Sequence, residues 1–131
     1  MRWLYRSKPR EGLDEAIKWH GDLKAAHKIL DICNSAAGSA EKVGRQAGGT
    51  ETKTNRREVE RYERAAKTAM EIAVTISNDL LRDSAVCQIV ILCLRANSLK
   101  TALILFRAVQ GEFIRNEMLK DHPALRQAVA L

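Results

Sequence analysis

The sequence predicts an all-α protein of antiparallel helical hairpins, with six to seven helices in 131 residues. Three observations predict this class. Apolar residues recur at spacings of three and four along most of the chain, which is the periodicity of one face of a helix. No stretch alternates apolar and polar residues as a half-buried strand does. Aromatic residues make up only 5% of the sequence, so aliphatic residues and alanine, which suit helices, must fill the core.

The first twelve residues are expected to form a flexible basic arm. Residues 1–12 contain four basic side chains, a proline and a glycine, and chain ends of this kind are poorly ordered unless other segments hold them. The remainder, residues 13–131, has the length of a single domain. It is predicted to begin with a short helix at 13–20 and a second helix at 23–33, separated by a break at the Gly-Asp pair 21–22.

A glycine-rich loop is predicted to interrupt the domain at 36–55. Four of the seven glycines fall there, among serine, threonine and charged residues. Glycine loses more backbone freedom than other residues on entering a helix, and each one disfavours a helix by about 0.8–1.0 kcal/mol relative to alanine. The segment is therefore expected to be a connection.

The segment 55–77 is the most strongly predicted helix. Its apolar residues are separated by 3, 4, 3, 4 and 3 positions; they are Val59, Tyr62, Ala66, Ala69, Ala73 and Ile76. This spacing forms a seam that packs against another helix. Residues 85–94 are apolar almost all round, so the helix there should be central, with Asp83 or Ser84 as its N-cap.

Three shorter helices are expected to follow. The helix at 99–109 should end at Gly111, because glycine often follows the last turn of a helix. Apolar residues at 113–119 predict the next helix. Pro123 is well suited to the first turn of a last short one.

The chain resembles itself at an offset of 33 residues. The matched pairs include Lys67 with Lys100, Thr68 with Thr101, Ala69 with Ala102, and Arg82 with Arg115. A third copy of the local pattern Lys-x-Ala-x-x-Ile/Leu occurs at 24–29. Self-similarity at this period is typical of stacked helical hairpins.

Segments 21–33 and 97–109 resemble the second helix of a tetratricopeptide repeat. The small residue of that helix is matched by Ala26 and Ala102, and the large residue four positions later by Leu30 and Phe106. The resemblance covers about half the chain and implies stacked hairpins that offer a concave surface to a peptide or protein partner. The first-helix signature of the family is missing here. A degenerate repeat and an irregular helical bundle are therefore both consistent with the pattern.

Protein binding is the function class that the pattern favours. The apolar excess of the helix at 85–94 predicts an apolar groove between hairpins, where another protein or a second copy of the chain would bind. The predicted partner-binding residues are Val86, Ile89, Val90, Cys93, Leu103 and Phe106. We expect a small adaptor or chaperone-like module.

Nucleic-acid binding is the alternative. The chain has 22 Lys and Arg against 16 Asp and Glu, and Arg57, Arg61 and Arg64 form a stripe at spacings of four and three. Such a stripe can follow a phosphate backbone. The competing interpretation is a solvated surface with internal ion pairs, because Glu60 and Arg64 form a favourable i,i+4 pair.

The sequence shows no catalytic or metal-binding pattern. His20 and His27 lie seven positions apart, and no third ligand follows at a fitting spacing. No serine or cysteine lies near a histidine in the sequence as an activated nucleophile would. We therefore expect neither enzyme activity, nor a cofactor, nor a metal ion.

The cysteines and the apolar runs indicate where the protein resides. Cys33, Cys87 and Cys93 are odd in number and lie in apolar segments, so they are expected to be buried thiols in a reducing compartment. The start of the chain has no secretory signal pattern. The longest apolar run has about ten residues, where a membrane span needs about twenty. We expect a soluble cytoplasmic protein.

Overall fold

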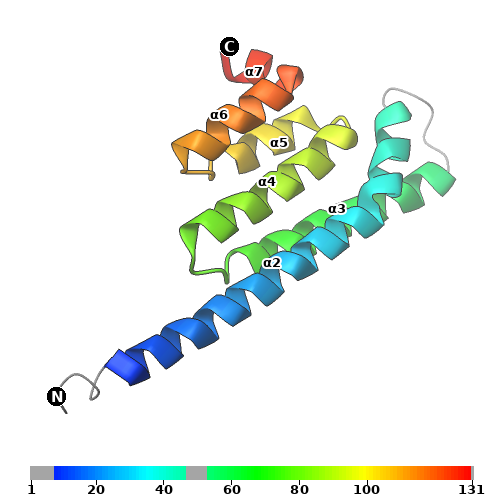
Figure 1. Ribbon diagram of the computed structural model, residues 1–131. Coiled ribbons are helices and arrows are strands. Elements are labelled where there is room, and N and C mark those ends of the chain that lie inside the picture. Colours follow the sequence, from blue (N-terminus) through cyan, green and yellow to red (C-terminus); the bar gives the residue numbers. More distant parts are fainter. Residues whose placement is uncertain (1–7, 47–52, 131) are drawn as a thin grey trace.

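The computed structural model describes residues 8–46 and 53–130, and within these ranges the protein contains helices and no strands. The helices are α2 (Lys8–Arg45), α3 (Lys53–Ala73), α4 (Asp79–Arg95), α5 (Leu99–Phe106), α6 (Glu112–Asp121) and α7 (Pro123–Ala130). The predicted all-α class is confirmed. Helices α2 and α3 form a long pair, and the shorter helices α4 to α7 stack on one side of it (Figure 1).

Helix α2 is continuous over 38 residues, where the sequence pattern predicted two short helices and a loop. The predicted break at 21–22 is wrong, and so is the first half of the loop predicted at 36–55. The carboxyl-terminal half of α2 packs against α3 and α4. The stabilisation from this burial offsets the low helix propensity of the glycines in α2. Residues 1–7 of the predicted arm lie outside the described residues, and residues 8–12 belong to α2.

One glycine of the predicted loop is a contact point between two helices. A Cβ atom at Gly44 would clash with the backbone carbonyl of Arg95, where α4 ends against α2. A Cβ atom at Gly38 would meet nothing. Gly44 is therefore needed because two backbones approach closely, and the chain does not turn there.

Helix α3 forms the predicted seam. Tyr62, Ala69 and Ala73 of this seam are buried, Val59 and Ala66 are partly buried, and the sixth predicted residue, Ile76, is buried in the turn after the helix. The helix begins at Lys53, inside the predicted loop, and ends at Ala73. It stops before Ser77 because the backbone N–H groups of Ser77 and Asn78 bond to Asp22 of α2.

Helix α4 is central, as its composition predicted. It packs against α2, α3, α5 and α6. Its N-cap is Asn78, whose side-chain oxygen accepts a hydrogen bond from the backbone N–H of Leu81 at 2.9 Å. The prediction that Asp83 or Ser84 caps this helix is wrong, because α4 begins at Asp79 and these residues lie in its second turn.

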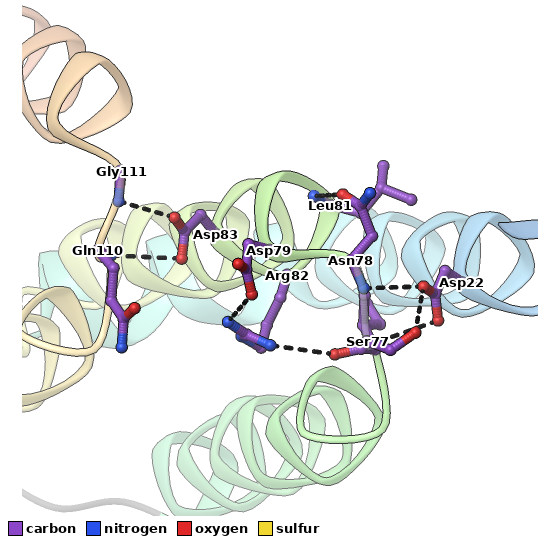
Figure 2. Close-up of polar contacts among 10 residues, drawn as sticks. Asp22, Ser77, Asn78, Asp79, Leu81, Arg82, Asp83, Gln110 and Gly111 are labelled. Atoms are coloured by element: carbon purple, nitrogen blue, oxygen red, sulfur yellow. Dashed lines mark hydrogen bonds and ion pairs between the residues drawn. The ribbon is translucent and has the colours of Figure 1, made fainter. Parts of the chain in front are cut away.

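Asp83 instead holds the start of a later helix. Its carboxylate accepts hydrogen bonds from the backbone N–H groups of Gln110, at 3.4 Å, and Gly111, at 2.9 Å (Figure 2). Gly111 is the N-cap of α6. The prediction that this glycine ends the preceding helix is therefore wrong: α5 stops at Phe106, and Gly111 has a φ of −63°, which any residue can adopt.

Asp22 makes the equivalent contact at the start of α4. Its carboxylate accepts hydrogen bonds from the backbone N–H groups of Ser77, at 3.1 Å, and Asn78, at 2.9 Å (Figure 2). Ser77 and Asn78 lie 33 residues before Gln110 and Gly111, the two residues that donate to Asp83. The offset equals the one found in the sequence.

A pair of arginines follows the same offset. The guanidinium group of Arg82 donates to the backbone carbonyl of Ile76 at 3.4 Å, and that of Arg115 donates to the carbonyl of Val109 at 2.6 Å. Each arginine thereby ties its own helix to the turn that precedes it. Pro123 is the first residue of α7, as predicted, and Ala102, the small residue of the family pattern, is fully buried in α5.

Candidate functional site

The residues predicted to bind a partner lie mainly in the core. Val86, Ile89, Val90, Cys93 and Phe106 are each at most 4% exposed, and Leu103 is partly buried. The prediction that they line an open groove is wrong for the first five. The reason is that α2 extends much further than expected and covers α4 together with α3 and α5.

A hollow does open between helices further out, where α3 faces α5. It encloses about 390 Å³, and we term it the α3–α5 groove. Its lining residues are Tyr62, Glu63, Ala66, Lys67, Met70, Ser98, Thr101 and Leu105. The groove therefore lies on the side of α3 next to the buried seam.

This groove combines apolar walls with a polar rim. Met70 and Leu105 are half-buried, whereas Lys67 and Thr101 are exposed. The ring of Tyr62 is buried in the wall; burial raises the pKa of its hydroxyl, and so does its hydrogen bond with Cys93. Such a site can bury an apolar side chain of a ligand while the rim contacts polar groups beside it.

The predicted arginine stripe lines a second hollow, on another side of α3. This hollow encloses about 400 Å³ between α3 and α2, and we term it the arginine hollow. Its lining residues are Ile32, Arg57, Glu60, Arg61, Arg64, Ala65 and Thr68. The structure thus brings the three predicted arginines to one cavity and adds an apolar side chain from α2.

These arginines form no ion pair within the described residues, although Arg61 lies close enough to the buried Glu58 to help lower the pKa of that carboxyl. In the part of the chain that the structure describes, no guanidinium group of the stripe lies within 4.0 Å of a carboxylate oxygen, so the expected ion pair of Glu60 with Arg64 does not form there. The buried Glu58 pairs instead with Lys42 of α2, at 3.7 Å. The hollow is therefore suited to an anionic group from outside.

The thiols are unsuited to nucleophilic chemistry. Cys33, Cys87 and Cys93 are buried and free, as predicted. Burial raises the pKa of Cys33 and of Cys87 to about 11, and it also raises the pKa of Cys93. A thiol that stays protonated at neutral pH is a poor nucleophile and a poor metal ligand.

The described residues provide neither a metal-binding cluster nor a membrane-spanning helix. Among residues 8–46 and 53–130, no three His, Cys, Asp or Glu side chains come together in a way that would hold a metal ion. In the same ranges, no helix combines the length and the apolar character needed to cross a membrane.

The sequence pattern did not reveal the α3–α5 groove, although one signal was present. Tyr62 and Ala66 of the seam are spaced by four from each other, and Met70 follows at the same spacing, so the three residues form an apolar stripe along one edge of the seam. The carboxylates that hold helix starts had no such signal. Asp22 and Asp83 are 61 residues apart, so the 33-residue offset relates the donors of these bonds and not the acceptors.

Comparisons with known proteins returned no match. No family model matches the chain, and neither a curated protein nor a solved structure does. The α3–α5 groove and the arginine hollow are therefore the features of the molecule that indicate a function.

Proposed function

We propose that the protein is a small protein-binding module, and that it holds an apolar side chain of its partner in the α3–α5 groove. The observation that carries this proposal is the groove itself, a hollow of about 390 Å³ between helices, with Met70 and Leu105 half-buried in its walls. Methionine is flexible and adapts to ligands of different shape, and for this reason it is common on peptide-binding surfaces.

We further propose that the 33-residue recurrence is a degenerate tetratricopeptide-like repeat. Support comes from the contacts of Asp22 and Asp83 with helix starts and from the matching contacts of Arg82 and Arg115. Stacked hairpins of that family generally bind peptides or proteins. The groove proposed here differs from the one expected from the sequence, because it lies between α3 and α5 and not over α4.

Site-specific photocrosslinking in the native host tests the groove. A photoreactive amino acid is placed at Lys67, on the rim, and its products are compared with those of the same amino acid at Glu117, an exposed position on α6. We expect a defined protein product at position 67 that position 117 does not give. Mass spectrometry of the product identifies the bound segment, which should contain an apolar residue at the crosslink.

A blocking variant makes the result specific. Thr101→Arg adds a long side chain to the groove from an exposed position, so the fold should tolerate it. It should abolish the crosslink from position 67, whereas Glu117→Arg should leave that crosslink intact. Equal products at positions 67 and 117, or a product that Thr101→Arg does not reduce, would count against the proposal.

Nucleic-acid binding at the arginine hollow is the second proposal. The charge of Arg57, Arg61 and Arg64 favours it, because none of them forms an ion pair with another described residue. The hollow holds a glutamate as well, and none of its lining residues is aromatic, so bases have no ring there on which to stack. Binding to a fluorescent oligonucleotide should weaken steeply with salt and disappear when the three arginines become glutamate. If no binding is detected at low salt, this proposal fails.

A further inference from the structure

Helices α2 and α3 run antiparallel, and the contacts between them fix which residues lie opposite each other. The buried Glu58 of α3 forms a side-chain hydrogen bond with Ser39 of α2 and an ion pair of 3.7 Å with Lys42. Ile32, seven residues before Ser39, lines the arginine hollow from α2. Ala65, seven residues after Glu58, lines it from α3. The two helices therefore keep one register along the hollow (Figure 1).

This register adds lysines of α2 to the side of the molecule that carries the arginines. Lys28 lies one turn before Ile32 on α2, at the end of the hollow where Thr68 of α3 lies, and Lys24 lies one turn further. Both lysines are exposed, and no described carboxylate lies within 4.0 Å of their ammonium groups. Cations from both helices therefore flank the hollow.

We term this surface the α2–α3 basic face. Its cations are Lys24, Lys28, Arg57, Arg61 and Arg64. The carboxylate of Glu60 lines the hollow beside them, and those of Asp31 and Glu71 lie further round the two helices. Positive charge therefore exceeds negative charge on this face, which suits it to a polyanion.

The composition of the basic face favours a phosphate backbone that is already rigid. None of the described residues that form the face is aromatic, so unpaired bases would have no ring on which to stack. A duplex keeps its bases inside and presents two strands of phosphates. Cations held on two packed helices contact these strands without the ordering cost that a flexible single strand pays. The exposed hydroxyl of Thr68 is placed to donate to the same phosphate oxygens.

We propose that the α2–α3 basic face binds double-stranded nucleic acid through its phosphates, a proposal that rests on the second function proposed above and names its substrate class. Lys24 and Lys28 contact the backbone from α2, and the three arginines contact it from α3. Sequence spacing identified the α3 side alone, because spacing relates residues within one helix, whereas the α2 side depends on the register between helices. Phosphate contacts carry no sequence information, so binding should not depend on base sequence.

Binding of the full chain to fluorescent probes tests the substrate class. The probes are a single-stranded DNA oligonucleotide of mixed sequence, the DNA duplex with its complement, and the RNA duplex of the same sequence. At low salt and equal phosphate concentration, fluorescence anisotropy should give at least about tenfold tighter binding to one or both duplexes than to the single strand. A duplex of unrelated sequence should bind with the same affinity.

Neutralisation of the two lysines tests the part that α2 plays. Each phosphate contact contributes about 0.9 to the slope of log affinity against log salt concentration, so Lys24→Gln with Lys28→Gln should lower the slope for the duplex by about 1.8. Lys100→Gln with Lys120→Gln removes the same charge at exposed positions on α5 and α6 and should leave the slope unchanged. Circular dichroism checks that both variants remain folded.

The outcomes distinguish duplex binding from nucleic-acid binding in general. A single strand that binds as tightly as the duplexes, or equal slopes for the two lysine variants, would overturn the proposal. In either case, loss of binding when the three arginines become glutamate would still support the second proposed function. If no probe binds at low salt, both proposals fail. A polyglutamate peptide that binds as tightly as the duplexes through the same residues would also overturn duplex binding, because the face would then serve an acidic protein.

Discussion

Asp22 and Asp83 lie on different helices and hold the starts of two later helices in the same way. Each carboxylate is buried and accepts hydrogen bonds from two consecutive backbone N–H groups, at the start of α4 for Asp22 and at the start of α6 for Asp83. The first N–H groups of a helix have no partner within that helix. Each aspartate therefore joins its own helix to the start of a later helix, α4 or α6, by accepting hydrogen bonds from backbone N–H groups that have no partner within that later helix.

Loss of the Asp83 carboxylate should destabilise the carboxyl-terminal hairpin. In Asp83→Ala, the N–H groups of Gln110 and Gly111 lose their acceptor in a partly buried place, and we expect the free energy of unfolding to fall by about 1–3 kcal/mol. Urea unfolding followed by circular dichroism measures the change. Asp79→Ala is the control, because its exposed ion pair with Arg82 contributes about 0–1 kcal/mol. Equal losses in the two variants would contradict the role assigned to Asp83.

Asp22 should make stability depend on pH in the acid range. Burial raises its pKa, but hydrogen bonds from the backbone of Asn78 and Ser77 and from the Ser77 hydroxyl outweigh burial and keep the pKa below its ordinary value of 3.8. The unfolded chain therefore takes up the proton first as pH falls. The stabilising effect is complete above the ordinary pKa and is lost as pH falls through the lower value of the folded state.

The measurement is urea unfolding of the wild type and Asp22→Asn over a pH series. The difference between their free energies of unfolding should be largest near neutral pH and should shrink below about pH 4. Asp31→Asn, which removes an exposed carboxylate from the same helix, is the control for the loss of one negative charge. A difference for Asp22 that stays constant into strong acid would refute the mechanism.

The fold class could be predicted because it depends on local spacing. The seam from Val59 to Ile76 and the apolar composition of 85–94 each identify a helix and its buried face without reference to the rest of the chain. The length of α2 could not be predicted in this way. Gly21, Asp22 and Gly38 disfavour a helix locally, and only contacts with α3 and α4 decide the outcome.

The candidate site was predictable only in part, for the same reason. The shared face of Arg57, Arg61 and Arg64 follows from their spacing on one helix. Their hollow also needs Ile32, which lies 25 residues earlier, and no local pattern links the two. The predicted groove on α4 failed because composition shows that a face is apolar but does not show which helix covers it.

The three thiols should be protected in the folded state. Burial raises the pKa of Cys33 and Cys87 from the ordinary value of 9.0 to about 11. Ellman's reagent should therefore label no cysteine of the native protein quickly at pH 8, and all three after unfolding in urea. The raised pKa values also contribute stability that is complete below pH 9 and is lost as pH rises toward 11, because the unfolded chain ionises first. Rapid native labelling would show that the core opens locally.

Two glycines of α2 should respond to alanine with opposite signs. In Gly44→Ala, the new methyl group clashes with the backbone carbonyl of Arg95. Backbone atoms cannot move aside as the end of a flexible side chain can, so the clash remains. Helices α2 and α4 must then move apart, and we expect a loss of about 1–3 kcal/mol in the free energy of unfolding. In Gly38→Ala, the methyl group meets nothing within 4 Å, and the higher helix propensity of alanine should stabilise the protein by about 0.5–1 kcal/mol.

Thermal unfolding of the two variants compares the predictions directly, because both substitutions are identical in chemistry and lie six residues apart in one helix. The melting temperature of Gly38→Ala should rise and that of Gly44→Ala should fall. If both rise, the approach of α4 to α2 at Arg95 is looser than the structure shows. If both fall, the segment around Gly38 is constrained by something other than helix propensity, and the continuous helix to Arg45 would lose its explanation.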